Sequence, residues 1–327
     1  MNMRTIYGML IVFGLLVTGT ACHEDSLSAE YEYNGPIPEI TNGPSEAQKI
    51  CYDLYQKYDY HVYYTLSGDD ALRTDVGQTQ TGMLWYLPED ALPLEAGDEA
   101  TSESFLTLLR LFYNALPVET AKTSVIKRQV LVKINLWNDE LLNYYGFWIP
   151  EIYSIAFTDE AQQGIVYWGE MDDAIGVQPD VWKYSIAISF FRTWTSTYYN
   201  HNVPVPTEFI QVSAGYYLSE MPEADQLDAM DAMYDWDTFE VDMDYLMNMG
   251  FIHPYSFVMA STKSYQNEDM ATYATWIVCN SLSERQEILD TYPLVKKKYD
   301  LTLKFYKDYL KIDLEEFSKF WLNVTVE

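Results

Sequence analysis

The sequence contains little cysteine and little positive charge. Three of its 327 residues are cysteine, and 20 basic residues stand against 49 acidic ones, for a formal net charge of −29. The cysteines form no C-x-x-C pair, which excludes a cysteine-type zinc site. A chain of this charge is not drawn to nucleic acid or to an anionic membrane surface, so we expect no nucleic-acid partner.

The sequence also lacks the motifs of several common enzyme classes. It has no G-x-S-x-G nucleophile elbow, no Walker-type phosphate loop and no dinucleotide-binding glycine motif. The sequence does not exclude a catalytic nucleophile system, such as Ser-His-Asp, formed by residues far apart in the chain.

The N-terminal apolar stretch, Ile6 to Val17, is too short to cross a bilayer, which takes about 20 residues. Arg4 precedes it, and the small residues 19–21 follow it before Cys22, as in a secretory signal. A cysteine at this position resembles a bacterial lipoprotein signal, in which Cys22 would be acylated. Ordinary secretory cleavage with an incidental Cys22 is the alternative.

These features predict the division of the chain and its location. We expect a signal peptide at 1–21, a flexible tether at 22–44 that is rich in glycine and proline, and a single domain at 45–327. Membrane attachment would come from acyl chains, which places the protein at the outer membrane or cell surface. Of the remaining cysteines, Cys51 and Cys279 would form either one disulfide or two free thiols.

Hydrophobic periodicity predicts three helices in the first half of the domain. Ser45-x-x-Gln48 is a capping-box pattern, and the helix that follows places Ala47, Ile50, Cys51, Leu54 and Tyr58 on one face. A second helix is predicted from Ser102 to Leu116, ending at Pro117, with one apolar face: Phe105, Leu108, Leu109, Phe112 and Leu116. A third is predicted at about 180–199, capped by Asp180, with one apolar stripe: Val181, Tyr184, Ile188, Phe191 and Thr195.

Strands are predicted between these helices. Tyr60–Leu66, 130–136, Ile152–Phe157 and Ile165–Trp168 have strand-like composition or alternation, and Met83–Leu87 is a further short candidate. After a proline-bounded loop at 203–206, nearly everything reads as helical. The prediction is an α+β fold with a sheet-containing lobe at 45–199 and a helical lobe at 200–327.

Several strings, in order, resemble the zinc-binding metallopeptidase lipoproteins encoded beside outer-membrane glycan-uptake systems. They are AQKICYDLYQKYDYHVYYTL from residue 47, PVPTEFIQVSAGYY at 204–217, Gly250-Phe251-Ile252, and Asn-Glu-Asp-Met-Ala at 267–271. The resemblance covers roughly residues 45–310. It implies a zincin-like fold with the helix at 180–199 in the place of the active-site helix.

The resemblance does not extend to the catalytic residues. The family carries H-E-x-x-H on this helix, where two histidines bind zinc and the glutamate activates water. Here Ser189, Phe190 and Thr193 stand at those positions, and Thr272 stands at the third ligand, a glutamate. Hydroxyl groups are poor substitutes for imidazole and carboxylate ligands, and phenylalanine cannot act as a base. We therefore expect no bound zinc and a degenerate, catalytically inactive family member.

Four other groups of residues carry weaker signals. His201, His253 and Glu268 would be the ligands of a relocated zinc site, although the histidines share no metal-ligand spacing. The acidic run 235–244 offers oxygen ligands but lacks the glycine and spacing of a calcium loop. Six lysines at 296–311 most simply form an exposed helix face. A sugar-binding platform is suggested by one aromatic cluster: Tyr144, Tyr145, Phe147 and Trp148.

The sequence thus favours a membrane-anchored lipoprotein that binds a glycan or a peptide, or assembles with an outer-membrane uptake complex. The alternative is a zinc-dependent metallopeptidase or other hydrolase whose site has moved. A structural lipoprotein without a small ligand is a third reading.

Overall fold

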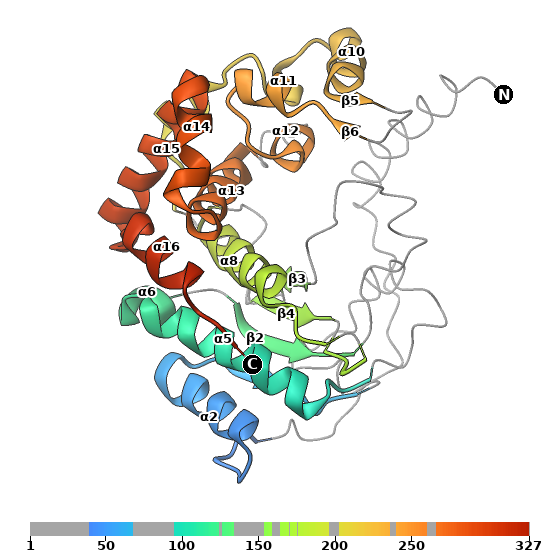
Figure 1. Ribbon diagram of the computed structural model, residues 1–327, viewed down its shortest axis with the longest axis vertical. Coiled ribbons are helices and arrows are strands. Elements are labelled where there is room, and N and C mark those ends of the chain that lie inside the picture. Colours follow the sequence, from blue (N-terminus) through green and yellow to red (C-terminus); the bar gives the residue numbers. More distant parts are fainter. Residues whose placement is uncertain are drawn as a thin grey trace, which may run out of the picture. The chain divides into compact units, whose positions relative to one another are not determined.

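The computed structural model describes residues 39–67, 95–123, 126–133, 154–158, 164–169, 171–174, 176–195, 203–235, 240–259 and 266–326. All of them belong to one compact unit, Ile37–Glu327 (Figure 1). The predicted signal peptide, Cys22 and the candidate strand Met83–Leu87 lie outside the described residues.

The first helix, α2 (Glu46–Tyr58), forms as predicted. Ser45 is its N-cap, and both hydrogen bonds of the capping box are present: Gln48 N donates to Ser45 Oγ, and Ser45 N to Gln48 Oε1, each at 3.3 Å. The five residues predicted for its inner face are all buried. The helix ends at Asp59, whose φ of 61° turns the chain sharply into strand β1 (His61–Tyr63).

A four-stranded sheet follows, in the order β1-β2-β4-β3. The other strands are β2 (Ile126–Leu131), β3 (Ser154–Thr158) and β4 (Gly164–Trp168), with β2 parallel to β1 and β4, and β3 antiparallel to β4. The strand predicted at 130–136 was placed too late. It was predicted from the alternation of a half-buried strand, but β2 is an inner strand, and its residues 129–131 are all fully buried.

Helix α5 (Glu99–Ala115) begins three residues before the predicted start and ends before Pro117, and the short α6 (Val118–Lys122) follows. Residues of α5 that were predicted to share one face are buried. They are Phe105, Leu108, Leu109 and Phe112.

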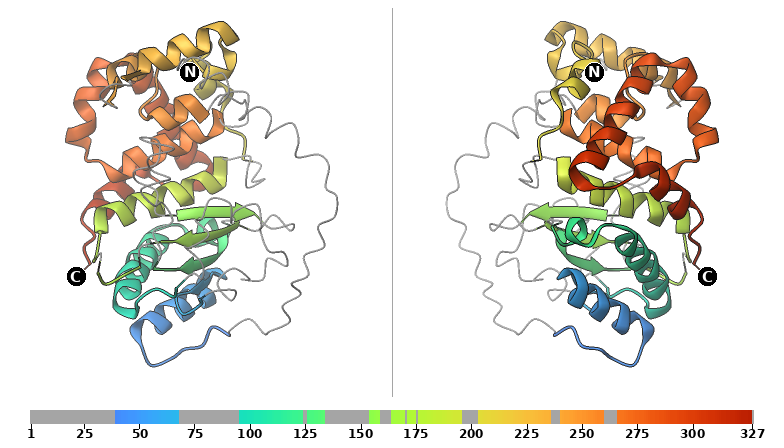
Figure 2. Two further views of the ribbon diagram at one scale, coloured as in Figure 1. Left: turned by 90° about the vertical axis from the view of Figure 1, so that its right-hand side faces the viewer. Right: turned by 90° about the vertical axis from the view of Figure 1, so that its left-hand side faces the viewer.

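Helix α8 (Pro179–Thr195) packs against α5 and, more extensively, against α13 (Gln266–Cys279), as Figures 1 and 2 show. The prediction of one apolar stripe was wrong, because every side chain from residue 185 to residue 191 is buried. Val181 and Tyr184, at the start of the predicted stripe, are only partly buried. A helix enclosed by neighbours has no polar face for a 3.6-residue pattern to reveal.

In the described part of the second half the chain is helical, as predicted, apart from one small two-stranded sheet. Its elements are α9 (Thr207–Val212), the 3₁₀ turn η4 (Leu218–Glu220), α10 (Glu223–Met233), β5 (Tyr234–Asp235), β6 (Glu240–Val241), α11 (Met243–Asn248), α12 (Pro254–Met259), α13, α14 (Leu282–Thr291), α15 (Pro293–Phe305), the π-helical turn η6 (Tyr306–Leu310) and α16 (Leu314–Leu322). The fold is thus mixed, mostly helical, with small sheets.

One lysine of the 296–311 group is not exposed. Lys298 is fully buried on α15, and its Nζ lies 2.5 Å from Oδ2 of Asp269 on α13. The Tyr217 hydroxyl donates to the same oxygen at 3.1 Å. Four aromatic rings surround the ammonium with centroids 4.4–5.8 Å from Nζ. They belong to Phe209, Tyr217, Phe251 and Tyr273.

The remaining cysteines do not pair. Cys51 is buried in α2 and Cys279 is partly buried at the end of α13, and both are free thiols. Burial raises the pKa of the Cys51 thiol to about 12, so this group is unreactive at neutral pH. Within the described residues, no helix has the length and apolar character needed to cross a membrane.

Candidate functional site

The structure brings α8 and α13 side by side, the two helices on which the sequence resemblance places the expected ligand positions (Figure 2). Ser189 is buried on α8. Thr193 also lies on α8, but its side chain is outside the described part of the structure. Thr272 is buried on α13 and donates its hydroxyl to the carbonyl oxygen of Glu268 at 3.1 Å.

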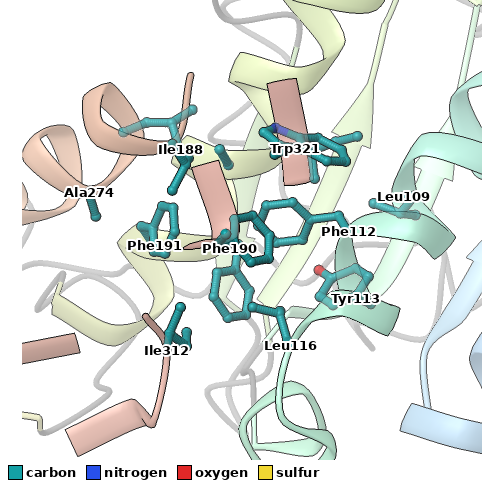
Figure 3. Packing of buried hydrophobic residues seen from close by; sticks show 14 of the residues in the cluster. Leu109, Phe112, Tyr113, Leu116, Ile188, Phe190, Phe191, Ala274, Ile312 and Trp321 are labelled. Atoms are coloured by element: carbon teal, nitrogen blue, oxygen red, sulfur yellow. The ribbon is translucent and has the colours of Figure 1, made fainter. Parts of the chain in front are cut away.

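Phe190, which the sequence resemblance aligns with a catalytic glutamate, is a core residue. Its ring is 1% exposed and lies 5.3 Å from the ring of Phe112, 5.4 Å from Phe191 and 6.0 Å from Trp194 (Figure 3). Phe112 in turn contacts Trp321 at 5.1 Å. This side chain therefore takes part in an aromatic cluster that joins α5, α8 and α16.

An ion pair links α8 to α13 beside these positions. Arg192 Nε lies 3.8 Å from Glu268 Oε2, and both side chains are largely buried, with exposed fractions of 16% and 8%. Arg192 is three residues after Ser189 on α8, and Glu268 is four residues before Thr272 on α13. The pair thus joins the two helices near the positions where the family's ligands would meet.

His253 belongs to the same cluster. It lies immediately before α12, and burial together with the positive charge of Arg192 lowers the pKa of its imidazole to about 4. Two of the three residues of the predicted relocated zinc site, His253 and Glu268, therefore share Arg192 as a neighbour. The third, His201, lies outside the described residues.

These residues do not fit a zinc ion. The family positions supply the hydroxyls of Ser189 and Thr272 and the hydrocarbon ring of Phe190, none of which is a usual zinc ligand or base. The capable groups nearby, His253 and Glu268, both interact with the guanidinium of Arg192. An arginine stays protonated, so a divalent cation held by these groups would be repelled by it.

A separate group of carboxylates is formed by residues outside this cluster. Asp98, Asp172 and Asp173 place one oxygen each within 4.8 Å of one another, the one such group found among the described residues. Its oxygens already accept hydrogen bonds: Asp98 from Lys133 Nζ at 2.6 Å and from Asp173 N at 2.8 Å. The Lys133 hydrogen bond lowers the pKa of Asp98. Both oxygens of Asp98 are thus occupied by protein donors, and these surface carboxylates by themselves indicate no metal.

The other sequence candidates form no site among the residues that the structure describes. The aromatic platform, Tyr144, Tyr145, Phe147 and Trp148, lies outside the described residues. In the acidic run, Asp242 caps α11 by accepting from Tyr245 N at 2.9 Å, and Asp244 accepts a hydrogen bond from the Tyr292 hydroxyl. His61 lies 3.5 Å from Asp59 at the start of β1.

Sequence reasoning missed Arg192, which is central to the cluster. The available signal was that Arg192 is the one charged residue between Ile188 and Asn200. A charge that becomes buried in such a stretch needs a buried partner, because an unpaired buried charge costs several kcal/mol. The sequence did not reveal which acidic residue that partner was.

The low pKa of His253 predicts an acid-sensitive contribution to stability. The folded state favours neutral imidazole, so this contribution is complete above about pH 6.5 and is lost as the pH falls toward 4, by up to about 3 kcal/mol. Urea unfolding of the wild type and of His253→Gln at pH 7 and pH 4.5 measures it. The variant should lose less stability between the two pH values, and equal losses would contradict the assignment.

Comparison with known proteins identifies the fold. The sequence matches no protein-family model and no curated protein. A solved structure from Bacteroides caccae, described as a "putative zinc-binding metallo-peptidase", matches with a TM-score of 0.52 at 13% sequence identity. The match covers 84% of this chain and 90% of that protein. The chain therefore shares the fold of that protein, and at this identity the likeness shows the fold alone.

Proposed function

We propose that this chain is a lipid-anchored, non-catalytic protein on a metallopeptidase-like, zincin-type scaffold. It acts outside the cytoplasm by binding a glycan or a peptide, or by assembling with an outer-membrane uptake complex. Acylation of Cys22 provides the anchor, because this cysteine directly follows a lipoprotein-like signal in the sequence.

One observation carries the proposal: Arg192 and Glu268 form an ion pair between the two helices that hold the family's ligand positions. A metallopeptidase needs a cation at such a place to polarise the scissile carbonyl and to activate water. A metal ion binds a water molecule and lowers its pKa. A guanidinium that is paired with a carboxylate does not bind water in this way and cannot replace the metal. The pair joins α8 to α13 without supplying that chemistry.

A zinc-retention experiment tests the proposal. Full-length protein purified in detergent is incubated with excess zinc, passed through a gel-filtration column, and analysed for zinc per chain by mass spectrometry. We expect no retained zinc and no hydrolysis of a casein substrate, because no described residue at the family positions offers an imidazole or a carboxylate.

An authentic zinc peptidase treated in parallel is the positive control. Retention of about one zinc per chain, together with hydrolysis that a chelator abolishes, would overturn the proposal. In that case His253→Gln and Glu268→Gln separate a relocated site from one elsewhere, because only the relocated site would lose its zinc.

A further inference from the structure

A pocket of about 430 Å³ opens where the end of α2, the end of α6 and the start of β2 meet. Residues 55–59 form one wall, and Lys122 and Lys127 form the other. This volume lies within the range of small-molecule sites, about 300–1,000 Å³. The pocket lies in the sheet-containing half and shares no residue with the α8–α13 cluster.

The pocket gathers positive charge in a strongly acidic protein. Three of its seven lining residues are lysines, Lys57, Lys122 and Lys127, whereas the whole chain has only 20 basic residues. None of the three forms an ion pair with a carboxylate in the described part of the chain. Other exposed lysines do so, as Lys307 with Asp313 and Lys319 with Glu316 show. The lysine charge in the pocket is therefore not neutralised by a direct ion pair.

Protein contacts hold two of these ammonium groups in place. Lys127 Nζ donates to the carbonyl oxygens of Tyr58 at 2.9 Å and Lys122 at 2.6 Å, and Lys57 Nζ donates to Asn114 Oδ1 at 2.6 Å. An ammonium has three N–H donors, so Lys127 keeps one beyond these two bonds. Partial burial and the nearby Lys122 lower the pKa of Lys127, and Asp59 opposes this shift. An anion in the pocket would relieve the same repulsion.

The rest of the wall suits a hydroxylated ligand. Tyr55 is partly exposed, with its ring 4.9 Å from His61 in an edge-on arrangement, and Gln56 is exposed beside it. An aromatic ring with adjacent amide and hydroxyl groups can pack against a sugar ring while it satisfies hydroxyls.

We propose that this pocket binds a sugar acid, with its carboxylate between Lys122 and Lys127 and its ring beside Tyr55. The inference rests on the proposed binding function and names the ligand class and the site. Negative charges that lie more than a Debye length from the pocket are largely screened there, since this length is about 8 Å at physiological ionic strength.

Isothermal titration calorimetry of the full-length protein with galacturonate, galactose and inorganic phosphate tests the proposal. We expect galacturonate to bind, and galactose, which lacks the carboxylate, to bind at least about tenfold more weakly. Lys122→Glu should weaken galacturonate binding by about tenfold or more, because it replaces an attractive charge with a repulsive one.

Lys304→Glu is the matched control, since it makes the same charge change at an exposed lysine on α15, away from the pocket. Lys127→Met is a second variant in case Lys122→Glu unfolds, and circular dichroism reports folding for each. Equal effects of the two Glu variants, or equal binding of galactose, would overturn the proposal. Phosphate binding as tight as galacturonate binding would assign the pocket to inorganic anions and overturn the sugar-acid assignment.

The titration tests the sugar-acid site independently of the zinc experiment, which tests the proposed function. Zinc retention with hydrolysis would end the non-catalytic reading and leave the titration interpretable. A zinc-free protein that binds no galacturonate would overturn this inference alone.

Discussion

Replacing Lys298 with methionine is expected to lower the free energy of unfolding by about 3–5 kcal/mol. The substitution leaves the Asp269 carboxyl fully buried without its cationic partner, 2.5 Å away in the wild type. Asp269→Asn should be destabilising in the same range, because it leaves a buried ammonium among aromatic rings. Urea unfolding followed by circular dichroism measures both.

The double variant Lys298→Met/Asp269→Asn should be clearly more stable than the sum of the two single losses implies. Removing both charges ends the desolvation cost, and the asparagine still offers an acceptor to the Tyr217 hydroxyl. Lys296→Met is the matched control on the same helix, and loss of its exposed pair with Asp300 should cost no more than about 1 kcal/mol. Additive effects of the two buried substitutions would contradict the ion-pair assignment.

Phe190→Glu, which introduces the glutamate that the resemblance expects at this position, is expected to destabilise the protein by more than about 4 kcal/mol and to produce no hydrolytic activity. The Phe190 ring is 1% exposed and packs against Phe112 and Phe191, so a carboxyl group would enter an aromatic core without a partner. Thermal unfolding and the zinc assay measure the two consequences.

Phe190→Leu is the control for this substitution. It keeps an apolar side chain of similar volume, so the expected cost is about 1–1.5 kcal/mol. If Phe190→Glu were as stable as Phe190→Leu, the side chain would face a polar cleft instead of the core. Gain of chelator-sensitive hydrolysis would show that the scaffold retains a working site.

Local signals in the sequence were sufficient for elements with one buried face. The capping box at Ser45 and the five-residue face of α2 were predicted correctly, because capping and amphipathicity are read within a few residues of each other. The end of α5 before Pro117 follows from the same local rule. Strands β3 and β4 were located to within two residues at their starts.

Elements enclosed by the fold were predicted less well. The prediction of a strand at 130–136 assumed that one face of the strand meets water. The observed strand β2 begins at Ile126 and is an inner strand, with β1 on one side and β4 on the other. The predicted stripe on α8 failed for the same reason, since residues 185–191 are all buried. A periodic pattern arises from contact with water on one side, and it weakens where no side meets water.

In the candidate site too, some features were predictable from the sequence and others were not. The residue types at 189, 190, 193 and 272 are plain in the sequence, and they exclude the family's ligand set. The sequence did not show that Arg192 meets Glu268, or that His253 lies near them, because these residues come from three elements separated by up to 76 positions. Pairing across such distances depends on helix packing, which no local pattern encodes.

The sequence by itself determined the acidic character of the chain, the signal-like N-terminus, the capped helices and the missing zinc ligands, since each depends on composition or on neighbouring residues. Only the tertiary structure decided where charge is buried. Lys298 looked like part of an exposed lysine face, yet it is fully buried against Asp269. Burial of a charge is decided by whether the fold supplies a partner, and that partner lies 29 residues away on another helix.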